Sequence, residues 1–167
     1  RRPFLTGTNL DIEETVTLDN VCRLVDLLKR DFGKDFIITA APVAGSLAYD
    51  TPGMGGFVYK DLLKRPQGAM IDWFNVQCYG AYWGTYMIDK IVANGYPADK
   101  LVMGMLWNDF PDLKSLVAGM ATLHAVNAEH PTLRGAYIWQ HADAPMGPER
   151  WATLASHALS NEPLALT

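Results

Sequence analysis

Three polar side chains near the start of the sequence have types and spacing suited to acid–base chemistry. Asn9, Asp11 and Glu13 alternate with apolar residues, and side chains two apart share one face of a β-strand. Two carboxyl groups so close repel when both are ionised, which can keep one of them protonated as a general acid. Glu13, nearest the strand end, is the predicted proton donor. On this segment alone, a solvated strand end leading into a loop is the simpler alternative.

The segments that must position these side chains alternate between two periodicities. Apolar runs predict strands at residues 10–13, 35–41, 71–79, 101–106 and 136–140. Amphipathic patterns predict a helix that opens at Thr17 and ends before Gly33, further helices at 57–64, 86–94, 113–128 and 149–159, and a loop at 42–56. This alternation implies parallel strands covered by helices, an α/β fold. It fits a doubly wound sheet and a (β/α) barrel equally well.

Length and composition indicate a single globular domain. The 167 residues are enough for one sizeable core, and 49% hydrophobic with 19% charged residues is ordinary for a folded protein. A net charge of −4 without a basic stripe argues against a nucleic-acid partner. The longest apolar stretches are too short to span a bilayer, so no membrane segment is expected. Cys22 and Cys78 are expected to be buried free thiols rather than a disulfide.

The segment that carries the carboxylates also matches a known signature. It resembles Asp-Gly-x-Asp-x-Asp-x-Glu of the family 18 glycoside hydrolases, which are chitinases and endo-β-N-acetylglucosaminidases. Gly7, Asp11 and Glu13 stand in register with this signature, whereas Thr6 and Asn9 depart from it.

Two later strands extend the resemblance. The run Asn75 to Tyr79 resembles the sixth strand of the family, which carries Gln-x-Tyr in the plant-chitinase and endoglycosidase branches. The run Gly135 to Trp139 resembles the eighth strand, and residues 36–42 and 100–105 are similar to the fifth and seventh. The resemblance implies an incomplete (β/α)8 TIM barrel, about strands four to eight with their helices, in which residues 1–167 are one partial catalytic domain.

The resemblance implies a retaining, substrate-assisted hydrolysis of β-1,4 bonds next to N-acetylglucosamine, in chitin or in the chitobiose core of N-glycans. Glu13 would protonate the glycosidic oxygen while the N-acetyl carbonyl oxygen of the substrate attacks the anomeric carbon. Asp11 would hold the acetamido N–H, and Tyr79 would donate its hydroxyl to the acetamido oxygen. These three residues are the predicted catalytic set.

Five further residues are predicted to bind the sugar. The resemblance implies that Trp139 forms the floor of the subsite before the cut and that Gln77 binds the same sugar. Trp107 and Trp83, in loops after strands, are candidate sugar platforms, with simple loop packing as the alternative. Asn9 replaces a carboxylate with which the family exchanges a proton, so a weaker enzyme with its acid limb at lower pH is expected.

The expected partners follow from this interpretation. An oligosaccharide or polysaccharide is the expected ligand, no metal or cofactor is expected because the four His residues lack ligand spacing, and the missing part of its own barrel is a candidate partner. Family resemblance implies secretion, although cysteine usage leaves the compartment open. The alternatives are a catalytically weak or inactive chitinase-like carbohydrate-binding protein, and an α/β domain whose motifs match by coincidence.

Overall fold

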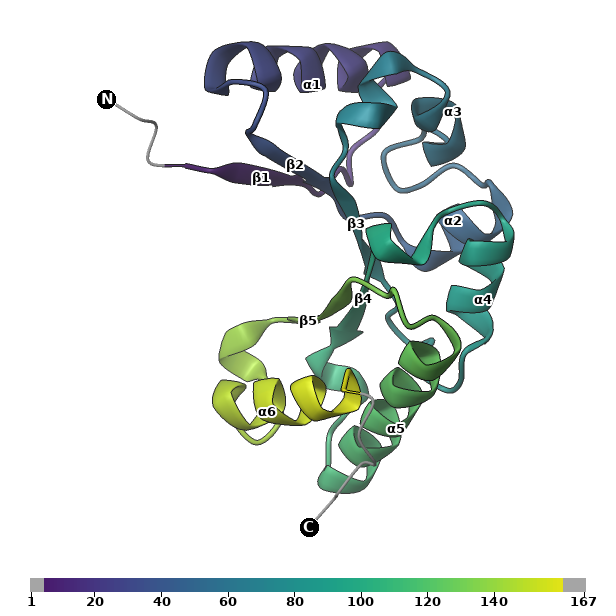
Figure 1. Cartoon of the computed structure of the whole chain (residues 1–167), viewed down its shortest axis with the longest axis vertical. Helices are drawn as coiled ribbons and strands as arrows, with labels where there is room; N and C mark the ends of the chain where they lie inside the picture. The colour runs from purple at the N-terminus through teal and green to yellow at the C-terminus, as the bar shows by residue number, and fades with distance from the viewer. Residues whose placement is uncertain (1–4, 161–167) are drawn as a thin grey trace.

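The computed structural model describes residues 5–160 as an arc of parallel strands with helices on its convex side (Figure 1). The strands are β1 (Gly7–Leu10), β2 (Ile37–Ala40), β3 (Trp73–Gln77), β4 (Leu101–Leu106) and β5 (Gly135–Trp139). They pair in chain order from β1 to β5, all parallel. A doubly wound sheet would reverse its strand order at some point. The unbroken order is that of an incomplete (β/α)8 barrel, as predicted.

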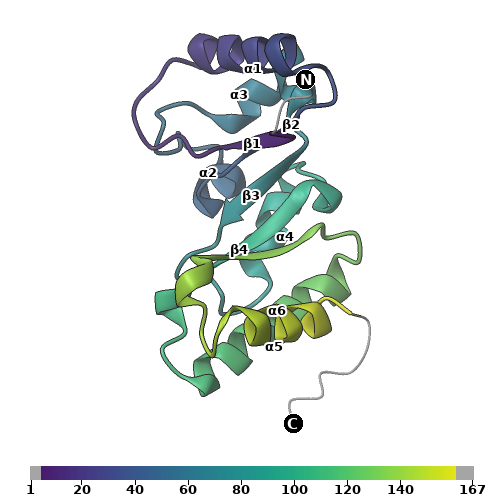
Figure 2. The same cartoon turned by 90° about the vertical axis from the view of Figure 1, so that its left-hand side faces the viewer.

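Helices follow the strands and cover the outer face of the sheet. They are α1 (Leu18–Phe32), α2 (Ala44–Tyr49), α3 (Tyr59–Leu63), α4 (Tyr86–Ala93), α5 (Leu113–Glu129) and α6 (Pro148–Ala158). Figure 2, turned toward the concave side, shows strands crossing in front of helices α2 and α4. Among the described residues, no helix is long and apolar enough to cross a membrane.

Helix α1 shows how local sequence sets these elements. The Thr17 hydroxyl accepts a hydrogen bond from the Asn20 N–H at 3.3 Å, so it caps the first turn. Val21 and Val25 face the sheet and are buried. Gly33 ends the helix with a φ of 99°, a conformation that costs a glycine little. Both predicted ends of this helix are therefore confirmed.

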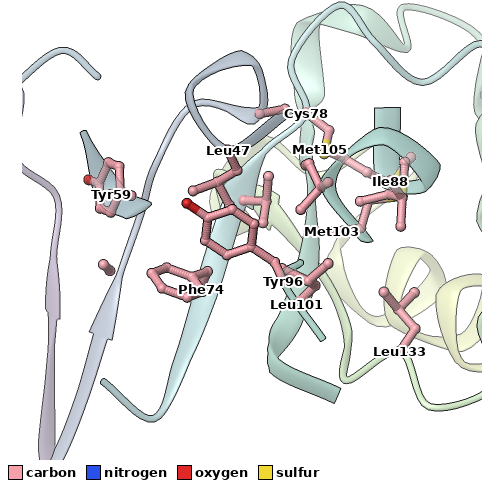
Figure 3. Packing of buried hydrophobic residues seen from close by; sticks show 14 of the residues in the cluster. Leu47, Tyr59, Phe74, Cys78, Ile88, Tyr96, Leu101, Met103, Met105 and Leu133 are labelled. Atoms are coloured by element: carbon pink, nitrogen blue, oxygen red, sulfur yellow. The ribbon is translucent and has the colours of Figure 1, made fainter. Parts of the chain in front are cut away.

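The apolar core lies between the sheet and the helices (Figure 3). Phe74 of β3 and Met103 of β4 point away from the concave face and pack among helix residues such as Leu47 and Ile88. Two predicted thiols belong to this layer, because Cys22 and Cys78 are both buried and free. Burial raises the pKa of the Cys78 thiol to about 12, so it is protonated and unreactive at neutral pH.

The first strand and the segment after β2 differ from the prediction. The strand expected at 10–13 lies at Gly7–Leu10 instead. Its last ladder bond runs from the Ala41 N–H to the Leu10 carbonyl at 3.0 Å. Beyond that point β2 gives way to helix α2, which lies inside the expected loop 42–56, so residues after Leu10 have no strand to pair with.

Asp89 of α4 contacts His130, the residue that follows α5, and the ionisation of Asp89 makes the stability of the chain depend on pH. Partial burial works to raise the pKa of Asp89, but hydrogen bonds from Thr85 and His130 outweigh it, so the pKa lies below its ordinary value. A lowered pKa stabilises the fold above the unfolded value of about 4, and this stabilisation is lost as pH falls through the folded pKa. We expect the stability advantage of wild type over Asp89→Asn to shrink below about pH 4.

Urea unfolding at several pH values measures this advantage. Asp35→Asn, at an exposed carboxylate, is the matched control and is expected to leave the pH dependence unchanged. A stability difference between wild type and Asp89→Asn that stays constant across the acid range would contradict the assignment.

Candidate active site

Side chains of strands β1, β3 and β5, and of residues that closely follow β1, β2 and β3, meet in a hollow at the carboxyl end of the sheet. The cavity has a volume of about 260 Å³. It is lined by Asn9, Asp11, Ala41, Asn75, Gln77, Tyr79, Tyr137 and Trp139. Five of these were predicted as site residues on separate segments of the sequence, and the fold brings them together.

The predicted proton donor lies beside this cavity rather than in its wall. Glu13 is exposed and lines an adjoining hollow of about 360 Å³ in the loop between β1 and α1. Asp11 lines both hollows and so connects them. Of Asn9, Asp11 and Glu13, Asn9 alone belongs to β1. The alternation of side chains along a strand therefore does not fix the direction of Glu13, which lies three residues past the end of β1.

A hydrogen-bond network on the concave face fixes the orientation of Asn9. The Trp73 indole N–H, which can only donate, bonds Oδ1 of Asn75 at 3.0 Å. The Asn75 amide nitrogen must then face an acceptor, and it donates to Oδ1 of Asn9 at 3.1 Å. The Thr39 hydroxyl donates to the same oxygen at 2.8 Å. With its oxygen occupied twice, Asn9 is left to present its N–H groups toward the cavity.

Gln77 holds Asp11 as well as facing the cavity. Its amide nitrogen donates to Oδ1 of Asp11 at 3.1 Å and to the Ala41 carbonyl at 2.9 Å. The second bond satisfies a backbone group next to the end of β2. Gln77 therefore both orients a carboxylate and completes the backbone hydrogen bonding of the strand beside it.

Tyr79 meets a second tyrosine that the sequence interpretation missed. The hydroxyls of Tyr79 and Tyr137 lie 3.4 Å apart. Burial raises the pKa of both side chains above the ordinary value, that of Tyr137 far above it. The signal for Tyr137 was present in the sequence, because it stands two residues before Trp139 and so shares its strand face.

The tryptophan predicted as the subsite floor and the two candidate platforms lie in three different places. Trp139 is 55% exposed and lines the cavity, and its peptide bond to Gln140 is cis. Trp107 lines a separate hollow with residues after β4 and β5, and Trp83, 69% exposed, lines a third hollow at the start of α4. Among these three tryptophans, Trp139 alone therefore contacts the cavity that holds Asp11 and Tyr79.

One group of side chains in the described part of the chain has the types and proximity to hold a metal ion. The ligand atoms of Asp89, Glu129 and His130 lie within 4.8 Å of one another, where α4 meets the end of α5. Nε2 of His130 already lies 2.7 Å from Oδ1 of Asp89. None of these residues lines the cavity on the concave face.

Comparisons with known proteins give matches to solved structures alone. No protein-family model and no curated protein matches the sequence. A fungal endo-β-N-acetylglucosaminidase from glycosyl hydrolase family 18 matches with a TM-score of 0.82 and 33% identity, over 95% of this chain and 58% of that protein. A chitinase from Aspergillus fumigatus matches with a TM-score of 0.75 and 30% identity, over 93% of this chain and 59% of the other.

A more distant structure shares the fold. A family 18 chitinase from Cycas revoluta, solved in complex with (GlcNAc)3, has a TM-score of 0.61 and 14% identity, over 93% of this chain and 68% of its own. The chain thus spans less than two thirds of the length of the fungal proteins that it resembles more strongly. With a TM-score of up to 0.82 and up to 33% identity along nearly all of its length, the chain belongs to the glycoside hydrolases of family 18, of whose barrel it is a part.

Proposed function

We propose that the protein hydrolyses β-1,4 glycosidic bonds next to N-acetylglucosamine, in chitin or in the chitobiose core of N-glycans. The observation that carries this proposal is the convergence of Asp11, Gln77, Tyr79 and Trp139 on one cavity at the carboxyl end of parallel strands. Active sites of (β/α)8 barrels form at this end. The two fungal relatives, an endo-β-N-acetylglucosaminidase and a chitinase, support the choice of substrate.

The proposed reaction uses the substrate as its own nucleophile. Glu13 donates a proton to the glycosidic oxygen while the N-acetyl carbonyl oxygen attacks the anomeric carbon, forming an oxazolinium ion and releasing the leaving sugar. Glu13 then removes a proton from water, which opens the ring with net retention of configuration. An internal nucleophile held in place lowers the barrier by about 7 kcal/mol or more, so residues that orient the acetamido group matter as much as the acid.

Three side chains are positioned for that orientation. Asp11, hydrogen-bonded by Gln77, accepts the acetamido N–H, and Tyr79 donates its hydroxyl to the acetamido oxygen, which holds that oxygen beside the anomeric carbon. The exposed face of Trp139 stacks against the apolar underside of the sugar ring. Asn9 contributes hydrogen-bond donors to the same cavity where a carboxylate would have contributed an acceptor.

Release of fluorophore from a methylumbelliferyl chitobiose or chitotriose glycoside tests the proposal. Turnover is expected, with the β-anomer as the first product in a proton NMR time course. A matched cellobiose glycoside, which lacks the N-acetyl group, is expected to give no turnover because it has no internal nucleophile. Cleavage of both glycosides at similar rates, or first formation of the α-anomer, would refute the mechanism.

A second candidate is a chitinase-like protein that binds such sugars without cutting them. The observation that favours it is the placement of Glu13 in an adjoining hollow, together with an amide at position 9. Isothermal titration with chitotriose separates the two functions, because binding without turnover in the glycoside assay supports the second one.

Secretion is part of the proposal for either function, because a secreted protein would meet chitin or N-glycans outside the cell.

The proposal also concerns the part of the barrel that this chain does not contain. Strands β1 and β5 are the two edges of the described sheet, and a closed barrel pairs every edge. We propose that further strands complete the concave wall around the sugar. A rise in kcat/KM for the chitotriose glycoside when such strands are supplied to the chain would support this component, whereas no gain over the chain alone would refute it.

A further inference from the structure

Two tyrosine hydroxyls meet in the cavity although their strands are not neighbours. Tyr79 follows β3 and Tyr137 belongs to β5, so β4 lies between them. Their hydroxyl oxygens are 3.4 Å apart across that strand. Within the described residues, each hydroxyl has the other as its one hydrogen-bond partner. Because each phenol has a single proton, one tyrosine donates to the other and the proton of the second remains available.

The strand between them is shaped to allow this contact. Gly104 of β4 pairs with Tyr137 in the sheet, and a Cβ atom placed on Gly104 would collide with the Tyr137 ring and its hydroxyl. The ring therefore occupies the space that any other residue at position 104 would fill. A glycine inside a strand often marks such a close approach, and here it lets Tyr137 reach over β4 toward Tyr79.

We infer that Tyr137 is a positioning residue that donates its hydroxyl proton to the Tyr79 oxygen and thereby leaves the Tyr79 O–H directed into the cavity. The opposite arrangement would leave the proton of the more deeply buried phenol without an acceptor. Both tyrosines line the cavity, in which a ligand or water accepts the proton of Tyr79. The inference rests on the proposed function, in which Tyr79 donates to the acetamido oxygen.

The charges around the pair agree with this direction. Burial raises the pKa of Tyr79, the hydrogen bond from Tyr137 lowers it, and the carboxylates of Asp11 and Glu13 raise it. For Tyr137, burial and the hydrogen bond to Tyr79 both raise the pKa. A hydrogen bond from Tyr137 stabilises the ionised form of Tyr79, so it opposes the influences that raise the Tyr79 pKa.

The ionisation of Tyr79 tests the inference without requiring turnover. Tyrosine ring carbons are labelled with ¹³C at Cζ, and the chemical shift is followed between about pH 9 and pH 12, around the ordinary tyrosine pKa of about 10. Tyr79→Phe identifies the resonance. We expect Tyr137→Phe to raise the pKa of Tyr79, because the donated hydrogen bond is lost.

Two further variants make the result specific. Gly104→Ala displaces the Tyr137 ring without removing it and is expected to raise the pKa of Tyr79 in the same direction, which decides the question if Tyr137→Phe does not fold. Tyr96→Phe is the matched control, because the Tyr96 hydroxyl is buried, has no hydrogen-bond partner among residues 5–160 and does not line the cavity. An unchanged or lower pKa of Tyr79 in folded Tyr137→Phe or Gly104→Ala would overturn the inference.

Kinetics then separate this inference from the proposed function. Tyr137→Phe is expected to lower kcat about fivefold with little change in KM, as for the loss of one neutral hydrogen bond. The same change on a Tyr79→Phe background is expected to have no further effect, because Tyr137 acts through Tyr79. A complete absence of turnover in wild type would refute the proposed function, while the Tyr79 titration would still decide the role of Tyr137.

Discussion

Glu13→Gln is expected to lower kcat for a methylumbelliferyl chitobioside by about 10³-fold, within the range for losing a general acid. Glutamine has the shape of glutamate but no proton to give to the glycosidic oxygen. Glu14→Gln is the matched control, because it removes the same charge from the next exposed residue of the same loop, and it is expected to leave kcat within about twofold of wild type.

The leaving group sharpens this test. A glycosidic oxygen that leaves as a weakly basic anion needs little protonation, so a dinitrophenyl glycoside depends less on a general acid than a methylumbelliferyl glycoside. We therefore expect Glu13→Gln to lose far less activity on the dinitrophenyl substrate. Equal losses on both substrates would mean that proton donation to the leaving group is not what the substitution removes, and that Glu13 limits turnover by another route, such as activating water in the second step or holding the loop after β1.

The sequence predicted an element correctly where its cap, its apolar periodicity and its end all indicated the same helix or strand. The cap at Thr17, the buried stripe of α1 and the break at Gly33 all indicated one helix, and the structure confirms it. The helix α2 escaped prediction because Pro42 and the glycines around residues 45–56 are typical of a loop. Burial of Ala44 and Leu47 against the sheet stabilises that short helix, and tertiary contacts of this kind leave no local pattern.

The site was only partly predictable, for a related reason. Asp11, Gln77 and Tyr79 come from separate segments, and their meeting in one cavity follows from parallel strands with aligned carboxyl ends. The end of β1 was misplaced because strand length depends on the partner strand, and β2 stops pairing after Ala41. Without a partner strand, the segment that carries Glu13 turns into the loop beside the cavity.

The two cavity residues that the sequence did not predict, Asn75 and Tyr137, contact side chains of other strands. The role of Asn75 depends on the indole of Trp73 at one end and on Asn9 at the other. Tyr137 depends on a glycine of the neighbouring strand. Each of these residues is unremarkable within its own segment, and its function is defined by register between strands, which periodicity within a segment does not give.

Phe74→Ala is expected to destabilise the chain by about 3 to 5 kcal/mol, the usual cost of emptying a buried phenylalanine site. Phe74 is 1% exposed, and its ring packs edge-on against Tyr96 at 5.7 Å and Tyr59 at 6.1 Å between centroids (Figure 3). Phe32→Ala is the matched control, because Phe32 is 38% exposed and, within the described part of the chain, its ring stacks on Phe36 alone. We expect it to cost about 1 kcal/mol.

Urea unfolding measures the free energy of unfolding of both variants. The expected difference between them follows from the different composition of the two faces of the sheet. The convex face carries the apolar core, whereas the concave face carries amides and hydroxyls such as Asn75 and Thr39 that bond one another. Stability is therefore concentrated in the layer that contains Phe74, while the concave face is left to bind a ligand. A loss on Phe74→Ala no larger than that on Phe32→Ala would mean that the concave network, rather than the helix layer, holds these strands together.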